Sequence, residues 1–161
     1  MNKVYLLIGG NIGDRMANLA MAVQLIEKYL GKLLQISSIY ETAAWGNTDQ
    51  ADFLNQAICI ETQLAPTQLM TQILDIEKKM GRARNIPLGP RTIDIDILYY
   101  NDAIVENEQV SIPHPRISAR KFVLYPLVEI APNYLHPILH KTNSLLLKEC
   151  GDSLAVYKKT S

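Results

Sequence analysis

The sequence has 161 residues, enough for one domain with a substantial apolar core, and its formal net charge is zero. A neutral chain has no overall field that would attract nucleic acid or a membrane surface, and no apolar run approaches the roughly 20 residues that a membrane span needs. The apolar run before Gly9 has only five residues, which is too few for a signal peptide. We therefore expect one cytoplasmic domain over residues 1–161, with small-molecule partners and no nucleic-acid or membrane partner.

The arginines are unevenly distributed along the chain. Five of the six fall between positions 82 and 120, whereas the ten lysines are scattered. Guanidinium groups are planar, permanently charged and suited to phosphate, so this clustering favours a local anion site over an ordinary solvated surface. The two cysteines, Cys59 and Cys150, are too few for a disulfide framework, and we interpret them as small buried hydrophobic residues.

In the first part of the chain, residues 4–8 are all apolar and predict a central strand. The glycine-rich turn at 9–13 resembles a phosphate cradle in position. It matches neither known glycine-rich phosphate motif, however, and a structural turn is the favoured interpretation. Asp14 is a suitable N-cap for a helix that runs to about residue 29 or 30.

The next elements complete a βαββαβ order, which is typical of the ferredoxin-like fold: an α+β antiparallel sheet with helices packed on it. Pro66 opens the second helix and Gly81 closes it. The expected strands are 33–41, 53–62 and 92–100, with loops at 42–52 and 82–90. In the last third of the chain, the sequence predicts a short strand near Val110 and a turn at 113–115. It also predicts helical segments near 118–130 and 143–149 and a final strand at 154–157.

The strand at 92–100 carries two acidic residues on one face. Strict alternation places Ile93, Ile95, Ile97 and Tyr99 on one side, and Thr92, Asp94 and Asp96 on the other. Two ionised carboxylates on neighbouring positions of one strand face repel each other, so one is protonated or a cation lies between them. Oxygen ligands of this kind suit Mg²⁺ rather than zinc or copper. An exposed strand face is the alternative.

Other polar residues are less specific. His114 lies between Pro113 and Pro115, which could hold its imidazole at a fixed angle, although by itself the pattern favours a surface turn. Phe53 and Asn55 share a strand face, and together they could stack on and hydrogen-bond to a flat heterocycle; a half-buried strand is the alternative.

Several motifs in fixed order give the chain a family resemblance. They are YLLIGGN (5–11), SIYET (38–42), FLN (53–55), IE (76–77), GRAR (81–84), GPRTIDIDI (89–97), PHPR (113–116) and RKFVLYPL (120–127). From residue 4 to about 132 the chain resembles the 6-hydroxymethyl-7,8-dihydropterin pyrophosphokinases of folate biosynthesis. That resemblance implies an α/β sandwich on a ferredoxin-like core. It also implies transfer of the pyrophosphoryl group of ATP to the pterin hydroxymethyl oxygen, with release of AMP.

The same resemblance implies roles for individual residues. Asp94 and Asp96 would hold two Mg²⁺ ions, and Arg82 and Arg91 would join them as catalytic residues. The ATP-binding set would be Glu77, Arg84, Arg91, His114 and Arg120, and the pterin set would be Thr42, Trp45, Phe53, Asn55 and Phe122. Two other functions are compatible with the pattern: another Mg²⁺-dependent nucleotidyl transferase, which would release pyrophosphate, and a non-catalytic nucleotide-binding ferredoxin-like module.

Overall fold

The computed structural model describes residues 1–43, 51–81 and 92–159. An antiparallel sheet of six strands lies at its centre, in the order β5-β1-β4-β3-β8, with β2 paired to another part of β4. Its strands are β1 (Asn2–Gly10), β2 (Lys32–Ile36), β3 (Tyr40–Thr42), β4 (Phe53–Thr62), β5 (Asp94–Tyr100) and β8 (Val156–Lys158). A small second sheet pairs β6 (Val105–Glu106) with β7 (Ser111–Ile112).

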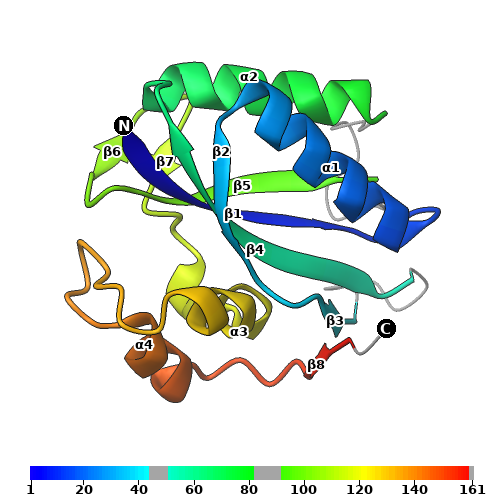
Figure 1. Cartoon of the computed structure of the whole chain (residues 1–161). Coiled ribbons are helices and arrows are strands. Elements are labelled where there is room, and N and C mark those ends of the chain that lie inside the picture. Colours follow the sequence, from blue (N-terminus) through cyan, green and yellow to red (C-terminus); the bar gives the residue numbers. More distant parts are fainter. Residues whose placement is uncertain (44–50, 82–91, 160–161) are drawn as a thin grey trace.

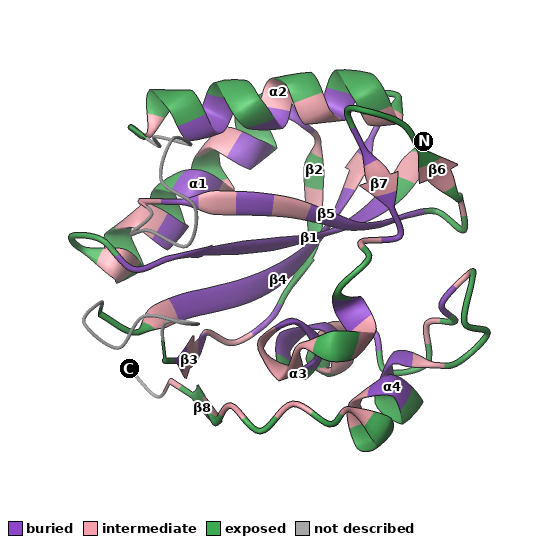
Figure 2. Cartoon of the chain, turned by 180° about the vertical axis from the view of Figure 1, so that it is seen from behind, coloured by how far each residue is buried: buried purple, intermediate pink, exposed green. Residues whose placement is uncertain are grey.

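Helices cover both faces of the large sheet (Figure 1). On one face lie α1 (Arg15–Tyr29) and α2 (Pro66–Lys79); on the other lie α3 (Lys121–Ile130) and α4 (Asn143–Glu149), with the short 3₁₀ helix η1 (Ile117–Ala119) before α3. A hydrophobic core fills each interface, and β1 and β4 are buried along most of their length (Figure 2). This explains the apolar run at 4–8, and the α+β prediction with a ferredoxin-like strand order is confirmed.

The residues predicted to begin and end the first two helices lie at those helix ends. The Asp14 carboxylate accepts a hydrogen bond from the backbone N–H of Ala17 at 3.1 Å, which satisfies a donor in the first turn of α1. Pro66 is the first residue of α2, and Gly81 follows that helix with φ = 82°, a backbone conformation that favours glycine. Within the described ranges, no helix is both long enough and apolar enough to cross a membrane.

The predicted strand at 33–41 is divided in two. β2 pairs with the C-terminal part of β4 and β3 with its N-terminal part. Between them, the Ser37 hydroxyl accepts from the Ala57 N–H at 2.9 Å, and the Ser38 N–H donates to the Glu129 carboxylate of α3 at 2.8 Å. These polar side chains replace ladder hydrogen bonds. The predicted turn at 9–13 also begins later, because β1 extends through Gly10.

The predicted alternation of β5 is wrong for Tyr99, which does not share a side of the sheet with Ile93, Ile95 and Ile97. Tyr5 pairs with Tyr99, but Leu6 pairs with Ile97, so Leu98 is an extra residue in β5. Such a bulge reverses the alternation of the side chains that follow. Tyr99 therefore packs in the core beneath α3, whereas Ile93, Ile95 and Ile97 lie in the core beneath α1 and α2, as predicted.

Candidate active site

A pocket of about 420 Å³ lies on the α3 side of the sheet. The sheet supplies its floor, and the segment around η1 and the start of α3 supply one wall. Its lining residues are Leu7, Gly9, Thr42, Ala43, Phe53, Asn55, Asp94, Asp96, Leu98, His114, Pro115, Arg116, Arg120, Phe122, Val123 and Leu154. The pocket thus brings together eight of the residues singled out in the sequence: Thr42, Phe53, Asn55, Asp94, Asp96, His114, Arg120 and Phe122.

Strand register fixes the polar residues on the floor. Gly9 of β1 lies opposite Asn55 of β4 on one side and opposite Asp94 of β5 on the other. Because adjacent strands are about 4.8 Å apart, the backbones at Asn55 and Asp94 are separated by roughly 10 Å. In the next row Leu7 lies opposite Asp96. The amide and the two carboxylates therefore occupy opposite ends of one short floor.

Gly9 leaves the space that this floor requires. A Cβ atom at position 9 would lie 2.3 Å from Asn55 Oδ1 and 2.7 Å from the carbonyl oxygen of Leu54. Both distances are far below van der Waals contact. Asn55 can therefore lie over β1 only because position 9 has no side chain.

The Thr42 and Phe53 side chains lie at the end of the pocket farthest from β5. The two residues are register partners in β3 and β4. Thr42 is buried, and its hydroxyl donates to the carbonyl oxygen of Ala155 at 2.9 Å. The hydroxyl hydrogen therefore holds the C-terminal segment, so a contact of Thr42 with a ligand at this end would use the hydroxyl oxygen as an acceptor or the methyl group.

The His114 imidazole has a defined hydrogen-bonding state. Its Nδ1 accepts from the backbone N–H of Arg116 at 3.1 Å, and the backbone N–H of His114 donates to the carbonyl oxygen of Leu98 at 3.0 Å. Burial lowers the pKa of His114, the Arg116 charge lowers it further, and Asp94 opposes the shift. The neutral ring then carries its hydrogen on Nε2, so it can donate one hydrogen bond.

Charges of both signs line the pocket. Arg116 and Arg120 flank η1, which is anchored by the fully buried side chain of Ile117. Among the described residues, no group of three or more His, Cys, Asp or Glu side chains is arranged as a metal site. Of the described residues that line the pocket, only Asp94 and Asp96 supply carboxylate oxygens, a donor set that fits Mg²⁺ when further oxygens come from a ligand.

Glu77 lies behind the acidic strand and does not line the pocket. It is 1% exposed on α2, and its carboxylate accepts from the backbone N–H of Ile95 at 2.8 Å. Ile95 lies between the two aspartates, so Glu77 holds β5 from the opposite face of the sheet. The contact with ATP that the resemblance implies for Glu77 stays a prediction.

Some residues were singled out in the sequence but lie outside the described ranges, and others were missed. Trp45, Arg82, Arg84 and Arg91 belong to the first group. Arg116 and Leu154 line the pocket but were not proposed as site residues. The clustering of arginines could have indicated Arg116. The sequence around Leu154 contains no motif that would indicate a site residue.

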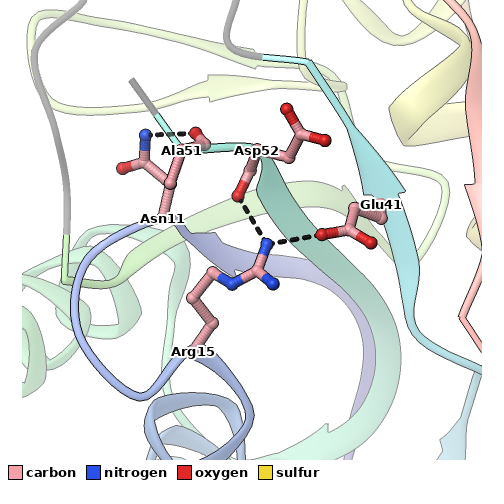
Figure 3. A network of polar contacts seen from close by, with 5 residues as sticks. All are labelled: Asn11, Arg15, Glu41, Ala51 and Asp52. Carbon is pink, nitrogen blue, oxygen red and sulfur yellow. Dashed lines mark hydrogen bonds and ion pairs between the residues drawn. The ribbon is translucent and has the colours of Figure 1, made fainter. Parts of the chain in front are cut away.

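A polar network supports the Thr42 end of the pocket from the α1 side (Figure 3). Arg15 Nη1 donates to Glu41 Oε2 at 2.6 Å and to the carbonyl oxygen of Asp52 at 2.8 Å. Asn11 Nδ2 donates to the carbonyl oxygen of Ala51 at 2.9 Å. One guanidinium group thus joins the end of β3 to the residue that precedes β4.

Comparison with known proteins decides the family. Residues 5–132 match the family model described as 7,8-dihydro-6-hydroxymethylpterin-pyrophosphokinase (HPPK). The chain belongs to the HPPK family. A 2-amino-4-hydroxy-6-hydroxymethyldihydropteridine pyrophosphokinase of Aquifex aeolicus is 42% identical over 88% of this chain and 88% of its own length. The enzyme of the same name from Bacillus subtilis is 46% identical over 80% of this chain and 78% of its own.

Longer proteins also match most of this chain. A folic acid synthesis protein of Schizosaccharomyces pombe is 40% identical over 95% of this chain, which spans 21% of that protein. Among solved structures, wild-type Plasmodium falciparum HPPK-DHPS with SDX-DHP has a TM-score of 0.74 at 21% identity. That match covers 92% of this chain and 43% of the solved chain, and it supports the HPPK fold alone.

Proposed function

We propose that this chain is a 2-amino-4-hydroxy-6-hydroxymethyldihydropteridine pyrophosphokinase of folate biosynthesis. It transfers the pyrophosphoryl group of ATP to the hydroxymethyl oxygen of 6-hydroxymethyl-7,8-dihydropterin. The observation that carries the proposal is the pocket of this HPPK-family chain, which is lined by Arg116 and Arg120 and has Asp94 and Asp96 on one side of Gly9 and Asn55 on the other.

The acidic end is proposed to bind the triphosphate of ATP. Arg116 and Arg120 would bind phosphate oxygens, and the neutral His114 would donate through Nε2. Asp94 and Asp96 would hold two Mg²⁺ ions together with phosphate oxygens. Bound there, Mg²⁺ would neutralise phosphate charge and acidify a coordinated alcohol. The resemblance adds Arg82, Arg84 and Arg91 to this end.

The other end is proposed to bind the pterin ring. Phe53 and Phe122 line the pocket and would stack on the ring faces, and Asn55 would hydrogen-bond to the edge of the ring that carries the donors and acceptors. A buried amide left unpaired by the wrong heterocycle would be penalised, which gives specificity. The resemblance adds Thr42 and Trp45 here. A ring anchored at Asn55 would extend its hydroxymethyl group over Gly9 toward Asp94.

The reaction requires mainly positioning and charge stabilisation. The hydroxymethyl oxygen would bond to the β-phosphorus of ATP as the bond between that phosphorus and the α,β-bridging oxygen breaks. The products would be the pterin pyrophosphate, AMP and the proton of the alcohol. Asp94 and Asp96 would hold the metal, which would supply the acidity that a coordinated alcohol needs, so no dedicated side-chain base would be required.

The test is to incubate the purified chain with ATP, Mg²⁺ and the pterin alcohol and to identify the nucleotide released. We expect AMP, and we expect Asp96→Asn to lower kcat by at least about a thousandfold if it removes a ligand of the metal clamp. Asp75→Asn is the matched control, since Asp75 is exposed on α2 and outside the pocket. Release of pyrophosphate would indicate a nucleotidyl transferase, and binding of ATP without turnover would indicate a non-catalytic module.

A further inference from the structure

We propose that Leu154 forms a wall of the pterin end of the pocket, held there by residues 152–158, called here the C-terminal strap. The strap lies beyond residue 132, where the match to the family model ends. The identity of the ring rests on the proposed function. The position of Leu154 in the pocket does not.

The first anchor of the strap is Asp152. One carboxylate oxygen of Asp152 accepts from the backbone N–H of Lys121, the first residue of α3, at 3.1 Å, and the other accepts from the N–H of Leu154 at 3.0 Å. A carboxylate at a helix N-terminus is favoured by the exposed amides and by the helix dipole. Asp152 therefore fixes the strap beside Phe122, the next residue of α3, which lines the pocket.

The second anchor joins the strap to β3. The Thr42 hydroxyl donates to the carbonyl oxygen of Ala155 at 2.9 Å, and Val156 is the register partner of Thr42 in the β3–β8 pair. The N–H of Lys159 then donates to the carbonyl oxygen of Ile39 at 2.7 Å. The strap is thus paired with the strand whose end lies at the pocket.

These anchors leave Leu154 little freedom. Three residue steps separate Asp152 from Ala155, so this stretch spans at most about 10 Å. Leu154 lies inside it and lines the pocket between the start of α3 and the end of β3. Phe122 and Thr42, on either side, belong to the end where we place the ring.

The leucine side chain can only make apolar contact. It offers no donor or acceptor, so it would contact a flat ring and exclude water from it. It would contribute nothing to the binding of phosphate. The prediction is therefore selective: loss of the Leu154 side chain should weaken binding of the pterin and leave ATP unaffected.

The experiment compares Leu154→Ala with the wild-type chain in the AMP-release assay. We expect KM for the pterin alcohol to rise roughly tenfold, as for loss of apolar atoms from a specificity pocket, with KM for ATP unchanged. Tyr157→Ala is the matched control, because Tyr157 lies on the same strap, is 67% exposed and does not line the pocket. Leu154→Met, which conserves apolar volume, should restore the wild-type KM.

Binding of 6-hydroxymethylpterin, followed by its fluorescence, provides a second readout without turnover. Leu154→Ala should weaken it, and Asp152→Asn should weaken it to a smaller extent. An unchanged pterin KM in Leu154→Ala, or an equal rise in both KM values, would overturn the inference. If Leu154→Ala does not fold, Leu154→Val tests the same direction of change. A wild-type chain that releases no AMP would refute the proposed function instead.

Discussion

The Arg15 guanidinium forms an ion pair of 2.6 Å with the Glu41 carboxylate, on the side of the sheet opposite the pocket. Glu41 precedes Thr42 in β3, and the same guanidinium also holds the carbonyl oxygen of Asp52, just before Phe53. The pair is only 26% and 28% exposed, so it is better shielded from solvent than a typical surface ion pair.

Arg15→Met should therefore loosen the strand ends that carry Thr42 and Phe53. We expect the free energy of unfolding to fall by about 1 kcal/mol. We also expect KM for the pterin alcohol to rise more than KM for ATP. Steady-state kinetics and urea denaturation measure both effects. Lys141→Met is the control, since its ion pair with Glu149 is 44% and 49% exposed and neither residue lines the pocket. Equal behaviour of the two variants would contradict a positioning role.

Glu77 provides a test of how the acidic strand is held. Glu77→Ala removes the acceptor of the Ile95 N–H, and loss of such a buried partner costs about 1–3 kcal/mol of stability. We expect kcat to fall with it, because β5 carries both aspartates. Glu77→Gln keeps a carbonyl oxygen in place and should be close to wild type. If Gln is as damaging as Ala, the charge itself is required, as the predicted ATP contact would demand.

Gly9→Ala should disturb the pocket floor. The added methyl group would overlap Asn55 Oδ1 and the Leu54 carbonyl oxygen, so we expect a loss of about 1–3 kcal/mol in stability and a higher KM for the pterin. Gly151→Ala is the control, because a Cβ at that position meets nothing within 4 Å. Thermal unfolding and kinetics measure the difference. A Gly9→Ala variant with normal pterin KM would show that Asn55 is not held by this contact.

The histidines predict how stability depends on pH. Burial lowers the pKa of His136, helped by His140, and burial also lowers that of His114. Below the ordinary value of 6.5 the unfolded chain therefore binds more protons than the folded chain, so stability should fall as the pH decreases through that region. Urea unfolding between about pH 7.5 and about pH 5.5 measures the slope.

His136→Asn isolates one contribution to this slope. The imidazole Nδ1 accepts from the N–H groups of Ile138 and Leu139, and the asparagine Oδ1 can replace that acceptor without titrating. We expect the variant to fold and to show a shallower dependence of stability on pH. An unchanged slope would mean that His136 titrates alike in the folded and unfolded chains.

Much of this fold is predictable from local sequence. Asp14, Pro66 and Gly81 mark helix ends through their own side chains or backbone preferences, and the strand at 53–62 follows from its composition. Tyr99 was misplaced because a bulge depends on pairing with β1, which alternation within one strand does not reveal. The break at Ser37 likewise depends on partners in β4 and α3.

Some of the site residues are also predictable from local sequence, and others are not. Asp94 and Asp96 lie on one face because the strand period is two, so their presence together in the pocket could be predicted. That Asn55 and Asp94 flank Gly9 follows from strand order, which motifs in a family resemblance can imply but periodicity cannot. Leu154 is brought to the pocket by hydrogen bonds of its neighbours Asp152 and Ala155 to Lys121 and Thr42. Lys121 and Thr42 are far away in sequence, so no local pattern indicates Leu154.

The empty position at Gly9 also bears on how such a chain can evolve. Every other amino acid carries a Cβ, so each missense change of the codon at position 9 would place an atom against Asn55. Under selection by an inhibitor that competes for this pocket, we expect resistance mutations to be rare on the floor. They should arise instead in the strap, where neighbouring residues such as Ser153 and Ala155 are exposed.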